Sequence, residues 1–240
     1  MPEWFEKWFG GTYLELYPHR DEKDAADAVA LIAANVPLEN IRVLDLACGP
    51  GRHSDLLRRR YGDAVGLDLS MALLRRAREC YSPPIPLARG DMRCLPFVSS
   101  CFELVVNLFT SFGYFETDEE NELVLREIAR VLKRRGRFVI DYLNASLVRD
   151  TLVEHEEQTL GERRVVIDRR ISDDGRFVFK EMDLIDEDRR FVERVRLFSS
   201  SELERLVVNA GFSVQERYGS YDGENLAADR PRVLLFSELL

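Results

Sequence analysis

The 240-residue sequence predicts an α/β protein whose mostly parallel sheet is covered by helices on both faces. From about residue 21 to the C-terminus, strand-like apolar runs alternate with segments of helical periodicity. Residues 43–51, VLDLACGPG, lead a hydrophobic strand into a glycine turn, and Asp68 ends the next predicted strand, 23 residues after Asp45. That separation is about one strand–helix–strand unit and predicts a nucleotide-sized crevice at the carboxyl edge of the sheet.

Each predicted strand is a short apolar run bounded by turn residues, and each predicted helix carries its apolar residues on one face. Strands are expected at residues 42–46, 64–67, 85–88, 104–108 and 138–142, and helices at 25–35, 52–61, 70–80 and 119–132. Later in the chain, a helix at 200–210 and strands at 213–217 and 233–236 are expected. The intervening loop, 218–231, is long for a hairpin, and we expect it to form part of an acceptor pocket.

Between about residues 162 and 198 the pattern changes to that of an antiparallel meander inserted into the α/β order. Its three strand-like runs are residues 164–171, 177–185 and 191–198, separated by acidic turns. The insertion is expected to cover the crevice, to form a subunit contact, or to have no function of its own.

Composition and charge narrow the functional classes. Thirty-four basic and 43 acidic residues give a net charge of −9, which argues against a nucleic-acid partner. The cysteines and histidines are scattered, so no metal site is expected, and no apolar run approaches the ~20 residues of a membrane span. Glu3, Glu6 and Lys7 interrupt the apolar N-terminal residues, unlike a secretory signal. We expect a single cytoplasmic domain over residues 1–240, as a monomer or homodimer.

The glycine turn indicates the kind of ligand. Gly49 and Gly51 let the backbone approach a ligand, and the following helix directs free N–H groups at it. Ser54 replaces the third glycine of a dinucleotide-binding motif, and the Asp45 carboxylate would repel a pyrophosphate. Asp45 suits a ligand whose tail carries an ammonium group, and S-adenosylmethionine has such a tail together with a ribose and an adenine.

A set of motifs then resembles a known family. Residues 43–53 (VLDLACGPGRH), 66–70 (GLDLS), 89–92 (RGDM), 129–132 (ARVL) and 136–138 (GRF) together resemble the class I S-adenosylmethionine-dependent methyltransferases. The resemblance covers roughly residues 13–145. In addition, Tyr218–Gly223 (YGSYDG) and Pro231–Leu235 (PRVLL) are similar to an uncharacterised bacterial subgroup of the small-molecule type.

The resemblance implies a Rossmann-like sheet of seven strands in the order 3-2-1-4-5-7-6, with strand 7 antiparallel and a small antiparallel β insertion. It also implies an N-terminal lid segment, residues 1–24, that folds over the cofactor and contains Tyr13. The cofactor would lie beyond the carboxyl ends of strands 1, 2 and 4, where Asn107 ends strand 4 and faces the reactive methyl group.

The resemblance further implies roles for single residues. Asp45 would hold the amino group of S-adenosylmethionine directly or through water, and Asp68 would accept hydrogen bonds from both ribose hydroxyls. Asp91 would accept from the adenine amine. The backbone at Ala47, Gly49 and Gly51 would line the methionine and ribose portions, and Leu69 and Met92 would enclose the adenine. Alternatively, Asp68 caps the following helix and Asp91 is only a turn residue. His53 is interpreted as a solvated helix residue.

The segment after strand 4 bears on the acceptor. Residues 107–110, NLFT, lack the prolines with which similar nucleic-acid amino methyltransferases place a flipped base. Cys101 precedes the strand, so it is not placed like the nucleophile of cytosine C5 enzymes. With the acidic net charge and the nearby aromatic residues Phe109, Phe112, Tyr114 and Phe115, this favours a small acceptor with an apolar portion.

Methyl transfer from a sulfonium depends mainly on alignment, so a protein group is needed only to orient the acceptor or take its proton. Tyr114 and Tyr142 are the candidate catalytic residues. Tyr221 and Asp222 could approach from the late loop, although Asp222-Gly223 is typical of a turn.

The hypothesis is therefore an S-adenosylmethionine-dependent methyltransferase that acts on N or O of a small molecule. The alternatives are an RNA methyltransferase, a nicotinamide (NAD)-dependent oxidoreductase, and a non-catalytic cofactor-binding scaffold.

Overall fold

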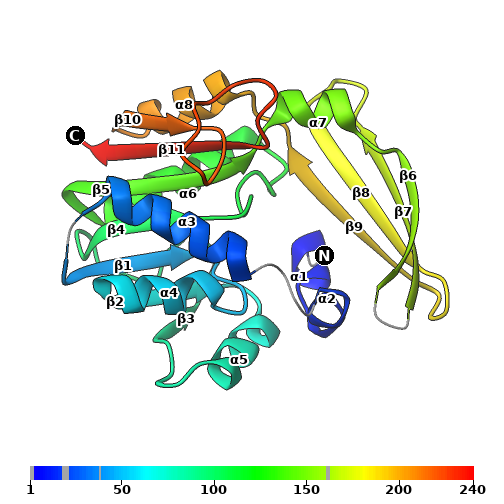
Figure 1. Ribbon diagram of the computed structural model, residues 1–240, viewed down its shortest axis with the longest axis horizontal. Coiled ribbons are helices and arrows are strands. Elements are labelled where there is room, and N and C mark those ends of the chain that lie inside the picture. The colour runs from blue at the N-terminus through cyan, green and yellow to red at the C-terminus, as the bar shows by residue number, and fades with distance from the viewer. Residues whose placement is uncertain (1–2, 18–21, 38, 161–162) are drawn as a thin grey trace.

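The structure is a computed structural model that describes residues 3–17, 22–37, 39–160 and 163–240. Within these residues the strands form a central sheet and a second sheet beside it, and α1 (Trp4–Trp8) and α2 (Gly11–Leu16) lie between the sheets (Figure 1). None of the described helices is long and apolar enough to cross a membrane.

In the described residues, the central sheet has the strand order β10-β11-β5-β4-β1-β2-β3. Strands β1 to β5 pair in parallel, whereas β11 is antiparallel to both β5 and β10. Numbered without the inserted strands, this is the predicted order 3-2-1-4-5-7-6, so the predicted fold class is confirmed. The strands are β1 (Ile41–Leu46), β2 (Gly62–Asp68), β3 (Leu87–Arg89), β4 (Phe102–Asn107), β5 (Leu132–Leu143), β10 (Phe212–Tyr218) and β11 (Arg232–Leu239).

Side chains that alternate along the strands bury both faces of the sheet. Val43 packs in the cluster with α3 and α4, whereas its neighbour Leu44 packs in the cluster with α6 and α8. Buried parallel strands of this kind read as near-continuous apolar runs, which is why they could be predicted. The helices flanking the sheet are α3 (Glu22–Asn35), α4 (Arg52–Tyr61), α5 (Met71–Cys80), α6 (Asp118–Val131), α7 (Ala145–Thr151) and α8 (Ser200–Asn209).

The second sheet is the predicted insertion, and we call it the insertion sheet. It contains β6 (His155–Leu160), β7 (Arg163–Ile171), β8 (Phe177–Leu184) and β9 (Arg189–Arg196), each antiparallel to its neighbour. The predicted boundary at residue 162 lies outside the described residues. The sheet already begins with β6 at His155, so the prediction of three strands was wrong. β6 was missed because it is a polar edge strand, HEEQTL, without the apolar pattern of the others.

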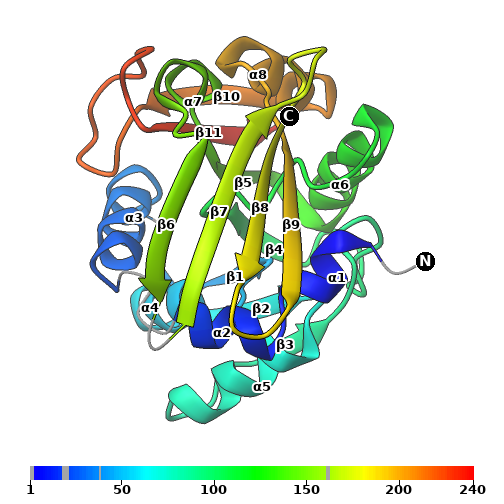
Figure 2. The ribbon, with the colours of Figure 1, turned by 90° about the vertical axis from the view of Figure 1, so that its right-hand side faces the viewer.

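The inner face of the insertion sheet docks on the N-terminal helices. Val165, Ile167, Met182 and Leu184 share an apolar cluster with Trp8, Tyr13 and Leu16. Figure 2 shows α2 behind the lower ends of these strands and α1 beside β9. The predicted lid segment, as far as it is described, is therefore two short helices held between the central sheet and the insertion sheet.

Candidate functional site

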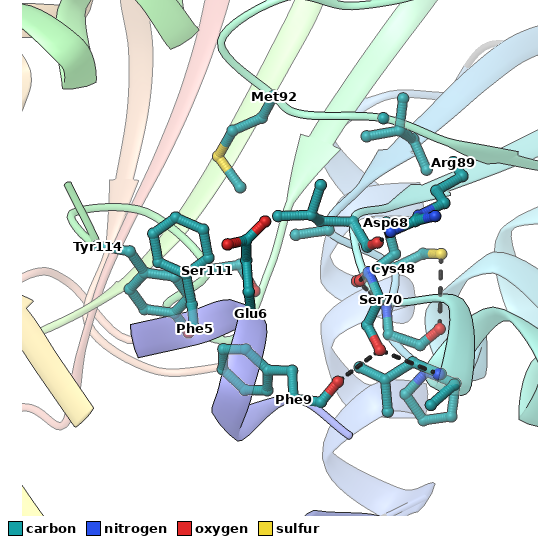
Figure 3. Close-up of a pocket in the computed structure, with 18 of the residues that line it drawn as sticks. Phe5, Glu6, Phe9, Cys48, Asp68, Ser70, Arg89, Met92, Ser111 and Tyr114 are labelled. Carbon is teal, nitrogen blue, oxygen red and sulfur yellow. Dashed lines mark hydrogen bonds between the residues drawn. The ribbon is translucent and has the colours of Figure 1, made fainter. Parts of the chain in front are cut away.

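A first cavity, about 320 Å³ in volume, lies at the carboxyl ends of β1, β2 and β3. We call it the turn cavity because the glycine turn forms one wall. Helix α1 covers it from the other side, and Figure 3 shows Glu6 between Phe5 and Tyr114 on one side and Asp68 on the other. Eight of the predicted site residues line this cavity: Tyr13, Ala47, Gly49, Asp68, Leu69, Asp91, Met92 and Tyr114.

Gly49 gives the turn cavity an open backbone wall. Its φ is +56°, and a Cβ added there would meet only Leu73 Cδ1, at 3.9 Å. Its amide donates a hydrogen bond of 2.8 Å to Asp68 Oδ2. The turn and the acid that ends β2 are thus joined directly.

Asp68 is a buried carboxylate with a fixed orientation. Its Oδ1 accepts from the Ser70 amide at 2.8 Å, while Oδ2 accepts from Gly49. Burial raises the pKa of Asp68, and the backbone hydrogen bonds oppose that effect. Since a carboxylate has about four acceptor positions, it retains capacity for ligand hydroxyls. Ser70, not Asp68, caps α5, because its hydroxyl accepts from the Leu73 amide.

Asp91 lines the turn cavity and is also a turn residue. Its Oδ1 accepts from the Arg93 amide at 2.8 Å, and Arg93 Nη2 donates to Oδ2 at 2.7 Å. The same guanidinium pairs with Glu3 and Glu120, which ties α1 and α6 to this corner of the cavity. Asp91 is therefore a turn residue, as one interpretation held, and it also lines the cavity; its contact with the adenine amine stays a prediction.

Asp45 and Gly51 are not among the residues that line the turn cavity, although Gly51 was predicted to line the cofactor and Asp45 to hold its amino group directly or through water. The Asp45 carboxylate is 1% exposed and accepts a hydrogen bond of 2.6 Å from the Ser54 hydroxyl beneath the turn. Burial raises its pKa to about 7, and the charge of Asp68 adds to the effect. Gly51 has a φ of +85°, and an added Cβ would lie 3.0 Å from Ile85 Cδ1 and 3.1 Å from Ala77 Cβ. This glycine is required by packing.

Asn107 and Tyr142 are also outside the turn cavity. Asn107 is fully buried, and its amide donates 3.0 Å to the Leu46 carbonyl, joining β4 to β1. Tyr142 is fully buried too, and its hydroxyl donates to the Arg196 carbonyl. The assignment of Tyr142 as catalytic is corrected, because a side chain enclosed in the core cannot reach a ligand.

His53 is a residue whose interpretation was wrong. It is 7% exposed and lines the turn cavity, and burial lowers its pKa to about 3 with help from Arg52 and Arg232. The missed signal is its spacing, since His53, Leu57 and Tyr61 recur every four residues on the buried face of α4.

A second cavity, about 580 Å³ in volume, adjoins the first beneath the insertion sheet. We call it the sheet cavity. Its roof includes Lys180 of β8 and Glu193 of β9, and its other walls come from α1, the segment after β4, α7 and the start of β11. Phe9, Phe109 and Tyr114 line both cavities. The two spaces therefore meet at three aromatic side chains.

Comparisons with known proteins point to a methyltransferase. Residues 43–136 match the family described as a methyltransferase domain. The chain is 28% identical to a dTDP-3-amino-3,4,6-trideoxy-alpha-D-glucopyranose N,N-dimethyltransferase of Streptomyces venezuelae, covering 87% of this chain and 90% of that protein. It is 26% identical to a dTDP-3-amino-3,6-dideoxy-alpha-D-glucopyranose N,N-dimethyltransferase of Streptomyces fradiae, covering 93% and 92%. The structure of an S-adenosylmethionine-dependent methyltransferase from Clostridium acetobutylicum ATCC 824 superposes with a TM-score of 0.80 at 18% identity, covering 95% and 98%.

The chain is an S-adenosylmethionine-dependent methyltransferase with the fold of the class I enzymes. S-adenosylmethionine is accordingly its cofactor, as the sequence predicted. The residues of this methyltransferase fit that molecule at the turn cavity, where an open glycine backbone, a buried carboxylate after β2 and the apolar side chains Leu69 and Met92 form the walls.

The sheet cavity of this methyltransferase combines apolar walls with paired charges. Lys180 Nζ lies 3.8 Å from Glu193 Oε2 and donates 2.8 Å to the Tyr17 hydroxyl. Arg169 Nη2 lies 2.9 Å from Glu156 Oε2. All four charged groups are on the inner face of the insertion sheet, which therefore presents both signs of charge to a bound molecule.

Proposed function

We propose that this methyltransferase methylates a nitrogen of a small molecule held in the sheet cavity, and that nucleotide-linked amino sugars are its substrate class. The main observation in support of this proposal is that the sheet cavity meets the turn cavity at Phe9, Phe109 and Tyr114. Two relatives that match along nearly their whole length are named as N,N-dimethyltransferases of such sugars, which supports nitrogen over oxygen. The RNA methyltransferase, oxidoreductase and scaffold alternatives receive no support from the comparisons.

We further propose how the turn cavity holds the cofactor. Asp68 accepts hydrogen bonds from the ribose hydroxyls, and the backbone at Ala47 and Gly49 lines the methionine portion. Leu69 and Met92 enclose the adenine, with Asp91 at its edge. Tyr13 covers the cavity from α2. Asp45 acts through the turn, because it supports Ser54 and adds negative charge beneath a ligand that carries positive charge.

When bound, S-adenosylmethionine supplies an electrophilic methyl group, which the lone pair of the acceptor nitrogen attacks in line with the methyl–sulfur bond while the neutral thioether leaves. The protein's part is to align the acceptor and to exclude water. Tyr114 stands at the junction of the cavities, and its carbonyl accepts 3.2 Å from Trp4 Nε1, which fixes this segment to α1. The aromatic junction and the Lys180–Glu193 pair then set the orientation of the acceptor.

The test is a methylation assay with labelled S-adenosylmethionine and a panel of acceptors analysed by mass spectrometry. The panel contains dTDP-3-amino and dTDP-4-amino deoxysugars, the matching sugars with a hydroxyl in place of the amine, and total RNA. We expect one or two methyl groups on the amino sugars. Methylation confined to the hydroxyl sugars or to RNA would contradict the proposal. The cytoplasmic location and the monomeric or dimeric state stay predictions, to be checked by fractionation and sedimentation.

A further inference from the structure

We propose that Asp141, Tyr221 and Arg232 are positioning residues for methyl transfer, because they hold Phe109 and Thr110 in place where the two cavities meet. The inference rests on the proposed function in one respect: turnover is measured with an acceptor bound in the sheet cavity. None of the three is proposed to touch the reacting atoms.

Phe109 and Thr110 have a backbone conformation that needs support. Their φ angles are +59° and +56°, so two consecutive non-glycine residues occupy the left-handed region. This region is disfavoured for residues with a Cβ, and most of all for β-branched ones such as threonine. Phe109 lines both cavities and Thr110 lines the sheet cavity. Strained backbone therefore lies between the two binding spaces, where it persists only if its surroundings fix it.

Asp141 supplies that support from β5. Its Oδ2 accepts from the Phe109 amide at 2.8 Å, and its backbone carbonyl accepts from the Thr110 amide at 3.0 Å. One residue thus satisfies both amides of the left-handed pair. Asp141 is fully buried, so its carboxylate requires partners of its own.

Those partners come from two distant segments. Arg232 Nη1 at the start of β11 donates to both carboxylate oxygens, at 3.0 and 3.1 Å, and the Tyr221 hydroxyl donates to Oδ2 at 2.6 Å. The Arg232 guanidinium also lies 5.0 Å from the centre of the Phe109 ring and 4.5 Å from that of Tyr221. The carboxylate and the phenylalanine ring are thus held by the same arginine.

This arrangement gives a role to motifs that the cofactor does not use. Tyr221 belongs to the YGSYDG segment and Arg232 to the PRVLL segment. Residues 218–231 were expected to form a pocket wall, but only Pro231 of them lines the sheet cavity. Asp222 is exposed in a turn, in which the Gly223 amide donates a hydrogen bond to the Ser220 carbonyl. The interpretation of Asp222 as a turn residue was therefore right. The loop reaches the site through Tyr221 and Asp141.

The first experiment compares Tyr221→Phe with Tyr218→Phe. Tyr218 is the matched control, because its hydroxyl makes a similar hydrogen bond, 2.8 Å to Asn35 Oδ1, and lines neither cavity. We expect Tyr221→Phe to lower kcat about tenfold, since small misplacements at a reacting centre are costly. The Kd for S-adenosylmethionine and the Tm should match those of Tyr218→Phe. Equal kcat in the two variants, or a loss of kcat that follows the loss of Tm, would overturn the proposal.

A second pair tests the arginine in the same way. Arg232→Lys keeps the charge but loses the planar contact with Phe109, and Arg230→Lys is the control, because Arg230 pairs with Glu224 at 2.9 Å on the exposed loop. We expect kcat to fall only in Arg232→Lys. An unchanged kcat in Arg232→Lys counts against the proposal.

Amide hydrogen exchange provides a readout that needs no acceptor. In the cofactor-bound enzyme, the Phe109 and Thr110 amides should exchange faster in Tyr221→Phe and Asp141→Asn than in wild type or Tyr218→Phe. Unchanged exchange overturns the positioning role whatever the acceptor is. Faster exchange in an enzyme that methylates no amino sugar supports the positioning role and shows that the proposed function has failed.

Discussion

The turn cavity and the sheet cavity are built in different ways. The turn cavity is formed largely by short segments that each follow a strand directly, residues 47–53, 67–73 and 89–92. The residues that line the sheet cavity are spread along the sequence between Trp4 and Arg232. They come mainly from α1, α7, the insertion sheet and β11. Under the proposed function, cofactor recognition depends on local backbone geometry, whereas acceptor recognition depends on side chains that only the tertiary fold brings together.

The electrostatics of the cavities differ as well. Buried acids, Asp68 on the wall and Asp45 beneath it, dominate one side of the turn cavity. The roof of the sheet cavity instead carries ion pairs, Lys180 with Glu193 and Arg169 with Glu156. The first arrangement favours a cation, and the second favours an acceptor that offers both donors and acceptors.

The largest effect on the cofactor side is expected from Asp68→Ala. Loss of a buried charged acceptor costs about 1.5–3 kcal/mol, so the affinity for S-adenosylmethionine should fall about 10- to 100-fold in calorimetry. Asp63→Ala is the control, since Asp63 lies at the exposed start of the same strand and pairs with Arg42 at 3.3 Å. Equal affinities in the two variants would remove Asp68 from the binding site.

The two glycines of the turn should separate binding from stability. Gly51→Ala places a Cβ against Ile85 and Ala77 at a positive φ, and it should lower the free energy of unfolding by about 1–3 kcal/mol in urea titrations. Gly49→Ala has the positive φ but open space, so it should be less destabilising and weaken cofactor binding more than Gly51→Ala does. The reverse ranking would show that Gly49 serves packing.

On the acceptor side, Glu193→Gln should raise the KM for the acceptor about fivefold, as expected for one weakened polar contact, with the Kd for S-adenosylmethionine unchanged. Glu181→Gln is the matched control on the opposite face of the insertion sheet, where Glu181 pairs with Arg190. If both variants behave alike in acceptor kinetics, the inner face of the sheet does not contact the acceptor.

The smallest effect concerns the pH dependence of stability. The pKa of Asp45 is raised by burial from 3.8 to about 7, so the native state holds a proton there that the unfolded state releases at lower pH. The associated stabilisation is complete below pH 3.8 and is lost as the pH rises through 7. Between pH 6 and pH 7 it should decline by about 1 kcal/mol in the cofactor-free protein.

Asp45→Asn should abolish that part of the decline, because asparagine cannot titrate but can still accept from Ser54. Urea unfolding of both proteins at pH 6 and pH 7 measures the difference. Identical pH slopes would mean that Asp45 is ionised throughout this range.

The sequence by itself predicted the α/β fold class and the cofactor crevice, and its resemblance to a known family implied the strand order and the cofactor. It could do so because buried parallel strands, the glycine turn and the acid after β2 are local patterns. Helix α4 shows how well this works, since its predicted and observed residues are both 52–61. The roles of the site residues remain predictions, although eight of them line one cavity.

Only the tertiary structure decided the rest. Tyr142 and Asn107 lie at the right ends of their strands, but their side chains are enclosed in the core. Asp141, Tyr221 and Arg232 lie up to 91 residues apart in sequence and meet only because β11 inserts beside β5. Such contacts arise from long-range packing, which leaves no short-range pattern in the chain.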